Sequence, residues 1–198
     1  MDVQTFVMIG RSGSGKGTQA ELLSRSLRER DSSSEVFYLE SGARFREFVA
    51  SAGHSQELAK QRMSRSDRQP DFLAVWMWAH LLIDNAHENQ HWIIDGTPRS
   101  KLEAEVIDSA FDFYGRSKPI ILYVNVSRGW SEIRLTARGR ADDRRVGDIK
   151  KRLDWFDNDV VPAIEWYRNN PKYFFCNING EQSIEEVHQE IISKLGRA

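Results

Sequence analysis

A glycine-rich segment near the amino terminus carries the clearest chemical signal in this chain. Four glycines fall between Gly10 and Gly17, with Lys16 inside the segment and Thr18 directly after it. Glycines let a backbone curl so that several N–H groups point at one anion, and the positive end of a following helix adds to that attraction. A lysine placed here reaches the outer phosphates of a nucleotide, and a nearby hydroxyl helps to place Mg²⁺. The segment therefore predicts a loop that binds a phosphorylated ligand.

The flanks of this segment meet the structural requirement of a phosphate-binding loop. An apolar run from Phe6 to Ile9 predicts a buried parallel strand, and apolar residues at helical spacing begin at Ala20. An ordinary strand-to-helix turn is the alternative, and the ordered strand, loop and helix disfavour it. The residues expected to bind the phosphates are Gly13, Ser14, Gly15, Lys16, Gly17 and Thr18.

Strands alternate with helical patterns along the whole chain. Four further apolar runs, each followed by a helical pattern, predict strands at 36–39, 92–94, 119–126 and 173–175. This alternation is typical of a parallel sheet with helices on both faces, so we expect a five-stranded α/β fold in one domain, 1–198. Ligands bind such sheets beyond the carboxyl ends of the strands, where Ser41, Asp95 and Arg99 also fall.

Local patterns predict four further features of the helices. Ser41 stands where it would cap the helix after the second strand, and residues 52–70 are polar enough to form a small surface excursion outside the core. The helix at 72–83 is so broadly apolar that we expect it to be buried on most sides, with its tryptophans in the core. An amphipathic helix at 149–167 should be kinked or restarted at Pro162.

Composition narrows the class of protein. The chain of 198 residues is 40% hydrophobic and 29% charged, and its net charge of −1 disfavours a general nucleic-acid binder. The single cysteine, Cys176, excludes an internal disulfide and any multi-cysteine zinc site. No apolar run reaches membrane-spanning length, and the first strand begins too close to Met1 for a signal peptide. We expect a cytoplasmic monomer without nucleic-acid or membrane partners.

Two motifs resemble those of a known family. Residues 10–19 resemble the phosphate loop of the adenylate kinase family of nucleoside monophosphate kinases, with Ser12 where that family usually has proline. Residues 95–100 resemble the Asp-Gly-Phe-Pro-Arg-Thr signature of adenylate and UMP/CMP kinases, with Thr97 in place of the phenylalanine.

Three more segments extend the resemblance in the family's order over nearly the whole chain. Residues 41–46 resemble Thr-Gly-Asp-x-x-Arg of the monophosphate site, with Ala43 in place of the acid. Residues 134–153 resemble a short lid rich in arginine, and 179–182 resemble the loop that contacts the donor adenine.

The resemblance implies a kinase that transfers the γ-phosphoryl group of Mg·ATP to a nucleoside monophosphate, with AMP ranked first. A monophosphate-binding segment at about 40–70 and a short lid at about 138–150 would close over the core. The implied cofactor is Mg²⁺ with ATP as donor, and the implied partners are nucleoside mono- and triphosphates.

The resemblance also assigns roles to individual residues. The catalytic residues would be Lys16, Arg99, Arg138, Arg140 and Arg152. ATP would be bound by the residues of the glycine-rich loop and, in addition, by Arg134, Arg138 and Gln182. The monophosphate side would comprise Ser41, Arg46, Gln69, Gly96, Arg99, Glu103, Arg140 and Arg152. Mg²⁺ would be held through water by Thr18 and Asp95.

Departures from the family gather around the acceptor base. Glu103 stands where adenylate kinases have a glutamine that recognises adenine, and Ser66, Arg68 and Gln69 replace a glycine and two apolar residues. A carboxylate only accepts hydrogen bonds, so a Glu103 that faced the base would suit guanine better than adenine. Glu103→Gln would then improve the use of AMP. The alternative is a Glu103 that is solvated or paired with Arg68 or Gln69, which leaves AMP as the substrate.

Other functions stay open at this point. The chain could phosphorylate another monophosphate such as GMP, CMP or UMP, or a different small acceptor. It could also be a non-catalytic nucleotide-binding module, although Lys16, Asp95 and the lid arginines are all present.

Overall fold

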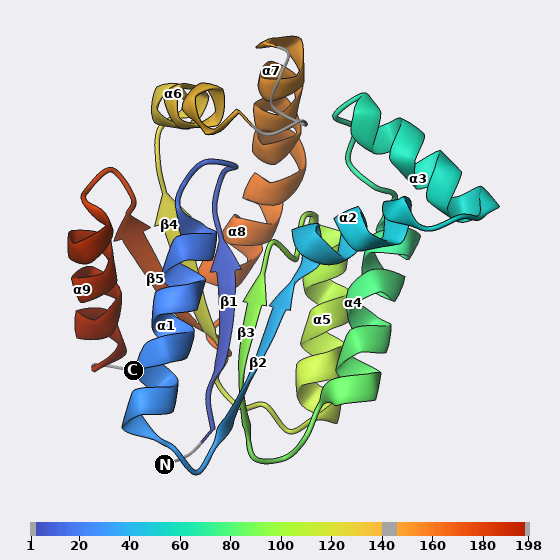
Figure 1. Ribbon diagram of the computed structural model, residues 1–198. Coiled ribbons are helices and arrows are strands. Elements are labelled where there is room, and N and C mark those ends of the chain that lie inside the picture. Colours follow the sequence, from blue (N-terminus) through green and yellow to red (C-terminus); the bar gives the residue numbers. More distant parts are fainter. Residues whose placement is uncertain (1–2, 140–145, 197–198) are drawn as a thin grey trace.

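Five strands form one parallel sheet at the centre of the molecule (Figure 1). The computed structural model describes residues 3–139 and 146–196. All neighbouring strands pair in parallel, in the order β2-β3-β1-β4-β5. Their bounds are β1 Thr5–Ile9, β2 Glu35–Glu40, β3 Gln90–Asp95, β4 Ile120–Asn125 and β5 Phe174–Asn179. This confirms the predicted α/β fold, with a fifth strand longer and later than its apolar run indicated.

Helices make every connection between consecutive strands. The helices are α1 Lys16–Arg30, α2 Ser41–Ala50, α3 His54–Ser64, α4 Asp71–Asn85, α5 Lys101–Phe113, α6 Arg128–Arg138, α7 Val146–Trp155, α8 Val161–Arg168 and α9 Ile184–Leu195. A π-helical segment, Phe156–Val160, joins α7 to α8, and Pro162 lies in the first turn of α8. The predicted restart at this proline is confirmed, because proline fits a helix only where no backbone N–H is needed.

Two helical layers cover the two faces of the sheet. Helices α1 and α9 lie on one face, and α4, α5 and α8 lie on the other (Figure 1). Phe6 and Met8 belong to the core under α1 and α9, whereas Val7 and Ile9 belong to the opposite core. Successive side chains of a strand point to opposite faces, so a central strand must be apolar throughout.

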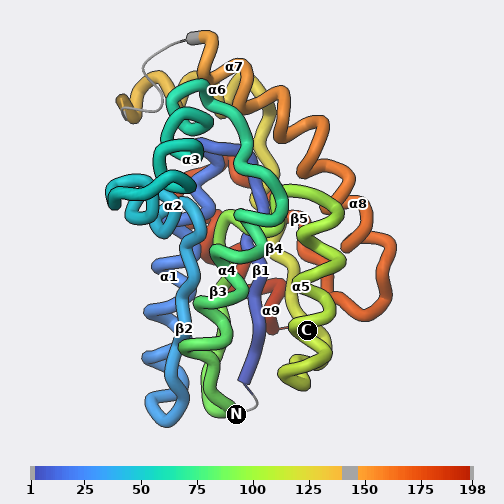
Figure 2. Tube along the Cα trace, turned by 90° about the vertical axis from the view of Figure 1, so that its right-hand side faces the viewer, coloured from blue at the N-terminus to red at the C-terminus, as the bar shows by residue number. Residues whose placement is uncertain are grey.

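Four helices gather at the carboxyl ends of the strands. In Figure 1, α2 and α3 extend over one side of this edge and α6 and α7 stand over the other. Figure 2, turned by 90°, shows the same four helices toward this end of the molecule, while the described chain begins and ends at the opposite end. The loop between β1 and α1 therefore opens between two sets of helices.

The segment 52–70 is more structured than its polar sequence indicated. It contains α3, and Ala59 is only 1% exposed. Ala59 joins Phe45, Leu73 and Met77 in a small apolar cluster separate from the two cores on the sheet. The segment therefore lies outside the two cores of the sheet, as predicted, and one small residue is enough to let α3 rest on its neighbours.

Helix α4 is less buried than predicted. Trp78 is 2% exposed, but Phe72 and Ile83 are 76% and 73% exposed. Trp76 is 46% exposed. Its ring packs against that of Phe48, with 5.6 Å between the two ring centroids. The prediction that most sides of this helix are buried is wrong, because α4 packs on the core of the sheet and on the small cluster under α2 and α3, and its remaining side is exposed. Even so, no helix in the described part of the chain is long and apolar enough to cross a membrane.

The two tryptophans of α4 provide a matched test of this burial. Trp78→Ala should lower the free energy of unfolding by about 3–5 kcal/mol, because it opens a cavity in the core. Trp76→Ala makes the same change on a half-exposed face of the same helix and should cost less than half as much. Equilibrium unfolding in urea measures both values. Equal losses would contradict the difference in burial between the two tryptophans.

Candidate active site

The loop between β1 and α1 has the backbone expected of a phosphate-binding loop. Gly15 directly precedes α1 with a φ of +87°, in the left-handed region that favours glycine. Gly13 is also left-handed, at +83°. Among the described residues, no side chain caps α1 and no acidic residue lies in its first turn. The first N–H groups of α1, beginning at Lys16, are therefore suited to an anion.

Side chains from several segments line one cavity at the carboxyl edge of the sheet. Its walls include apolar side chains, among them Phe45, Trp155 and Phe156. Its arginine side chains can form forked hydrogen bonds to phosphate oxygens. The residues from the sequence-based site that line it are Lys16, Arg46, Gln69, Asp95, Gly96, Arg99, Arg138 and Arg152.

Asp95 and Lys16 place opposite charges in the wall of this cavity. Asp95 is the last residue of β3 and is 4% exposed. Its Oδ2 accepts a hydrogen bond from the Tyr38 hydroxyl at 3.3 Å, and a Cβ added at Gly17 would lie 3.5 Å from the same oxygen. Burial raises the pKa of Asp95 and lowers the pKa of Lys16, while each charge opposes the shift of the other.

One oxygen of Asp95 fits the predicted role toward Mg²⁺. Its Oδ1 is buried without a hydrogen-bond partner in the described part of the chain. Carboxylate oxygens are ligands that Mg²⁺ prefers, directly or through water. Within residues 3–139 and 146–196, no three His, Cys, Asp or Glu side chains gather as a metal site. A bound Mg²⁺ would therefore keep most of its waters, as this ion commonly does.

Arg46 and Arg99 converge on the start of α2. A Cβ added at Gly42 would lie 3.4 Å from Nη1 of Arg46 and 3.6 Å from Nη2 of Arg99. Arg99 is held in place because its Nε donates to the carbonyl oxygen of Gly96 at 2.6 Å. Two guanidinium groups brought together in this way can share one phosphate group.

Ser41 does not cap α2 as predicted. The helix begins at Ser41 itself, with Glu40 before it as the capping residue. The Ser41 hydroxyl donates instead to the carbonyl oxygen of Gly96 at 2.7 Å and accepts from Nη2 of Arg99 at 3.4 Å. The cap prediction is wrong because β2 runs directly into α2, so this hydroxyl joins the end of β2 to the loop after β3.

Two residues of the site, Glu40 and Tyr38, carry no motif in the sequence. Glu40 lines the cavity, and its Oε1 accepts from Nη2 of Arg46 at 3.0 Å. It also pairs in register with Asp95 across β2 and β3. Tyr38 lies on the same face of β2, since alternate residues of a strand point to one side. This alternation is visible in the sequence, but the neighbour of β2 in the sheet is not.

A second, smaller pocket adjoins the loop on its other side. Arg134 stacks over Trp130, with its guanidinium carbon 5.1 Å from the ring centroid. Gln182 is held by a hydrogen bond from its Nε2 to the carbonyl oxygen of Asn179 at 2.8 Å. Three segments predicted to bind ATP therefore meet here. The predicted residues in this pocket are Ser14, Gly15, Thr18, Arg134 and Gln182.

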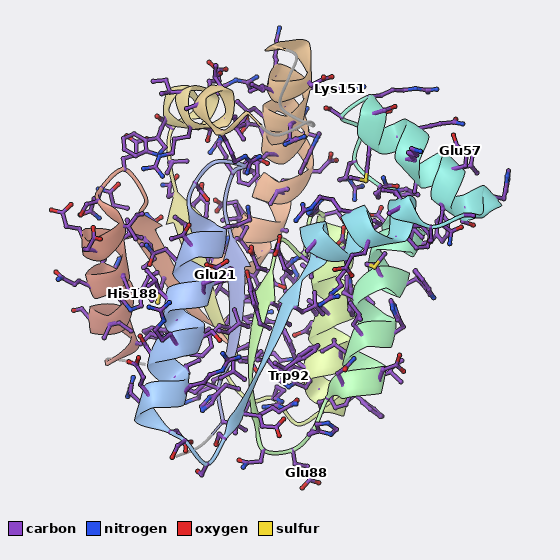
Figure 3. All side chains as sticks on the ribbon, in the orientation of Figure 1. Glu21, Glu57, Glu88, Trp92, Lys151 and His188 are labelled. Atoms are coloured by element: carbon purple, nitrogen blue, oxygen red, sulfur yellow. The ribbon has the colours of Figure 1, made fainter. Side chains whose placement is uncertain are left out.

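The predicted lid lies only partly within the described residues. Arg140 falls outside them, so its predicted roles stay predictions. Arg138 and Arg152, on either side of that gap, both line the main cavity. Lys151 pairs with Asp67, and Figure 3 shows Lys151 between α7 and α3. The segment after the gap therefore contacts the segment that follows α3.

Comparison with known proteins identifies the family. The model described as adenylate kinase matches residues 8–172. The chain belongs to the adenylate kinase family. It is 27% identical over 191 residues to adenylate kinase 1 of Nostoc sp., covering 96% of this chain and 98% of that protein. It is 29% identical over 196 residues to the adenylate kinase of Corynebacterium diphtheriae, covering 97% and 99%. It is therefore a nucleotide-binding phosphotransferase of the nucleoside monophosphate kinase type.

Within the adenylate kinase family, the two departures Thr97 and Glu103 prove to be bonded to each other. Glu103 is 1% exposed, and its Oε2 accepts from the Thr97 hydroxyl at 2.8 Å. Its Oε1 lies 3.5 Å from Nη1 of Arg68, and burial raises the pKa of the carboxyl group. Gln69 donates instead to the carbonyl oxygen of Ala59 at 2.9 Å. The alternative in which Glu103 is solvated is therefore wrong. Glu103 pairs with Arg68 and not with Gln69.

Removal of the Thr97 hydroxyl should destabilise the protein through Glu103. Thr97→Val keeps the shape but leaves a buried carboxylate oxygen without its donor, which should cost about 1–3 kcal/mol of unfolding free energy at neutral pH. The lost bond favours the ionised carboxylate, so the difference should shrink as pH falls and Glu103 takes up a proton. Thr136→Val is the control, because that hydroxyl is exposed on α6. Unfolding in urea measures both variants. Equal, small losses of unfolding free energy for Thr97→Val and Thr136→Val would show that the bond to Glu103 does not stabilise the protein.

Proposed function

We propose that this protein transfers the γ-phosphoryl group of Mg·ATP to AMP and so forms two molecules of ADP. The single observation that carries the proposal is the cavity in which Lys16, Asp95, Arg46 and Arg99 meet beside the phosphate-binding loop. Phosphoryl transfer needs two anionic substrates in line, surrounded by positive charge and shielded from water. Cations from separate segments around one cavity are suited to that task.

The donor is proposed to occupy the loop side of the site. The N–H groups at the start of α1 would bind its phosphates, and Lys16 would reach the phosphates at the point of transfer. Arg134 and Gln182 would lie near the donor base, because they border the smaller pocket. When bound, Mg²⁺ would neutralise charge on the donor phosphates, with Asp95 and Thr18 as its predicted partners through water.

The acceptor is proposed to occupy the side formed by α2 and the loop after β3. Arg46 and Arg99 would bind its phosphate, and Gly96 and Ser41 would shape the adjoining turn. Arg138, Arg152 and the predicted Arg140 would contact phosphates between the two nucleotides. The relatives named adenylate kinase favour AMP as the acceptor. GMP, CMP and UMP are the alternatives, and a cytoplasmic monomer remains the expectation from the sequence.

A coupled assay with ATP tests the proposed reaction directly. Among AMP, GMP, CMP and UMP, we expect AMP to give the highest kcat/KM. Lys16→Ala should lower kcat for AMP at least about a hundredfold, because its charge acts most strongly in the transition state. Lys101→Ala is the control, since it removes an exposed lysine on α5. A loss of less than about tenfold for Lys16→Ala, with the fold intact by circular dichroism, would remove this lysine from phosphoryl transfer.

Two arginine variants test the assignment of the acceptor side. Arg46→Ala and Arg99→Ala should raise the KM for AMP at least about tenfold, because charge-assisted bonds to phosphate contribute roughly 1.5–3 kcal/mol. The KM for ATP should change much less. Arg44→Ala is the matched control, because Arg44 lies on the same helix and pairs with Glu47 at the surface. Equal losses for both nucleotides would show that these arginines do not belong to the acceptor side.

A further inference from the structure

Arg68 is a cation of the cavity that none of the family motifs assigns. It lies after α3, and its side chain is 19% exposed. Its Nη1 donates to Oδ1 of Asp71 at 2.5 Å and lies 3.5 Å from Oε1 of Glu103. Its Nε lies 3.6 Å from Oδ2 of Asp159, in the π-helical segment. Carboxylates from three elements thus hold one side of the guanidinium group.

The other side of this guanidinium group is available to a ligand. Arg68 lines the main cavity together with Arg46 and Arg99. Within the described chain, Nη2 of Arg68 makes no hydrogen bond or ion pair. A guanidinium group has five N–H donors, so this nitrogen leaves two of them in a fixed position for an acceptor atom.

Glu103 is poorly placed to contact the acceptor base itself. Its two oxygens face Thr97 and Arg68, and it is not among the described residues that line the cavity. A closed set of bonds fixes this arrangement. The Ser100 hydroxyl donates to Asp71 at 2.8 Å and accepts from the backbone N–H of Glu103 at 3.1 Å. The carboxylate of Glu103 therefore pairs with Arg68 and Thr97.

Gln69 adds a hydrogen-bond acceptor beside Arg68. It lines the same cavity and is 5% exposed. Its Nε2 donates to the carbonyl oxygen of Ala59, but its Oε1 is buried without a hydrogen-bond partner in the described part of the chain. Buried polar atoms rarely stay unpaired in proteins. An amino group on a ligand would satisfy this oxygen.

We infer that Arg68, rather than the residue at 103, recognises the acceptor base in the proposed transfer to AMP. Nη2 of Arg68 donates to a ring nitrogen of adenine, and Oε1 of Gln69 accepts from its 6-amino group. Glu103 is a positioning residue that orients Arg68. This inference rests on the proposed function. It also removes the reason to expect guanine, because the carboxylate is not available to the two adjacent donors of that base.

Deaza analogues of AMP test the contact atom by atom. We expect either 1-deaza-AMP or 7-deaza-AMP to show kcat/KM about tenfold or more below that of AMP, the range for hydrogen bonds to charged groups. Arg68→Met should lower kcat/KM for AMP by a similar factor, mainly through a higher KM. In the Arg68→Met protein, replacing AMP by the sensitive analogue should then lower kcat/KM very little further. Arg65→Met is the matched control, because it removes an exposed arginine of the same segment that does not line the cavity.

A second variant tests the positioning role of Glu103. Glu103→Gln keeps the shape but weakens the hold on Arg68, so the KM for AMP should rise while the KM for ATP stays unchanged. In the Arg68→Met background, Glu103→Gln should then change the KM for AMP very little. A role for Glu103 in stability alone would instead give the same change in both backgrounds.

Several results would overturn the inference. One is a parent protein that uses AMP, 1-deaza-AMP and 7-deaza-AMP with the same kcat/KM. This result does not depend on the folding of any variant. Another is an Arg68→Met protein that matches Arg65→Met with AMP. A third is an improved use of AMP by Glu103→Gln, as expected if residue 103 contacted the base. If the parent phosphorylates none of the four monophosphates, the proposed function itself fails, whereas normal activity without these effects defeats only the role of Arg68.

Discussion

The attraction between the charges of Lys16 and Asp95 is the interaction on which the rest of the site depends. Burial disfavours both charges, and each one limits the cost of burying the other, so loss of either would leave the remaining charge without this compensation. The order of the sheet brings the two residues to one cavity. Strand β1 lies beside β3, with Met8 in register with Asp95, so the loop after β1 meets the end of β3.

The features that could be predicted from sequence are those set by contiguous residues. Apolar runs located the strands, the loop motif located Lys16, and Pro162 located the break before α8. Exposure of Trp76 could not be predicted, because helical periodicity does not tell whether a second layer covers the outer face. The bond from Ser41 to Gly96 was hidden for a similar reason, since it depends on which strand lies beside β2.

The proposed acceptor end of the site illustrates how separate departures from a family pattern can compensate for each other. Thr97, Glu103 and Arg68 lie in different segments, and each alone looks like a lost contact. Together they satisfy a buried carboxylate and fix a guanidinium group. Near Ala43, which stands in place of the family's acid, Glu40 supplies a carboxylate to Arg46. Such compensation depends on packing between elements, so the order of residues along the chain does not reveal it.

The contact between Glu40 and Arg46 has a consequence for how an anion enters and leaves. Both side chains are half exposed, so their attraction is weak and easily exchanged. In the proposed reaction, a phosphate that bound Arg46 would displace a carboxylate that is tethered to the end of β2 and cannot diffuse away. When the product left, that same carboxylate would return to the arginine. Binding would then exchange one partner of Arg46 for another, which would favour rapid release of the product over tight retention.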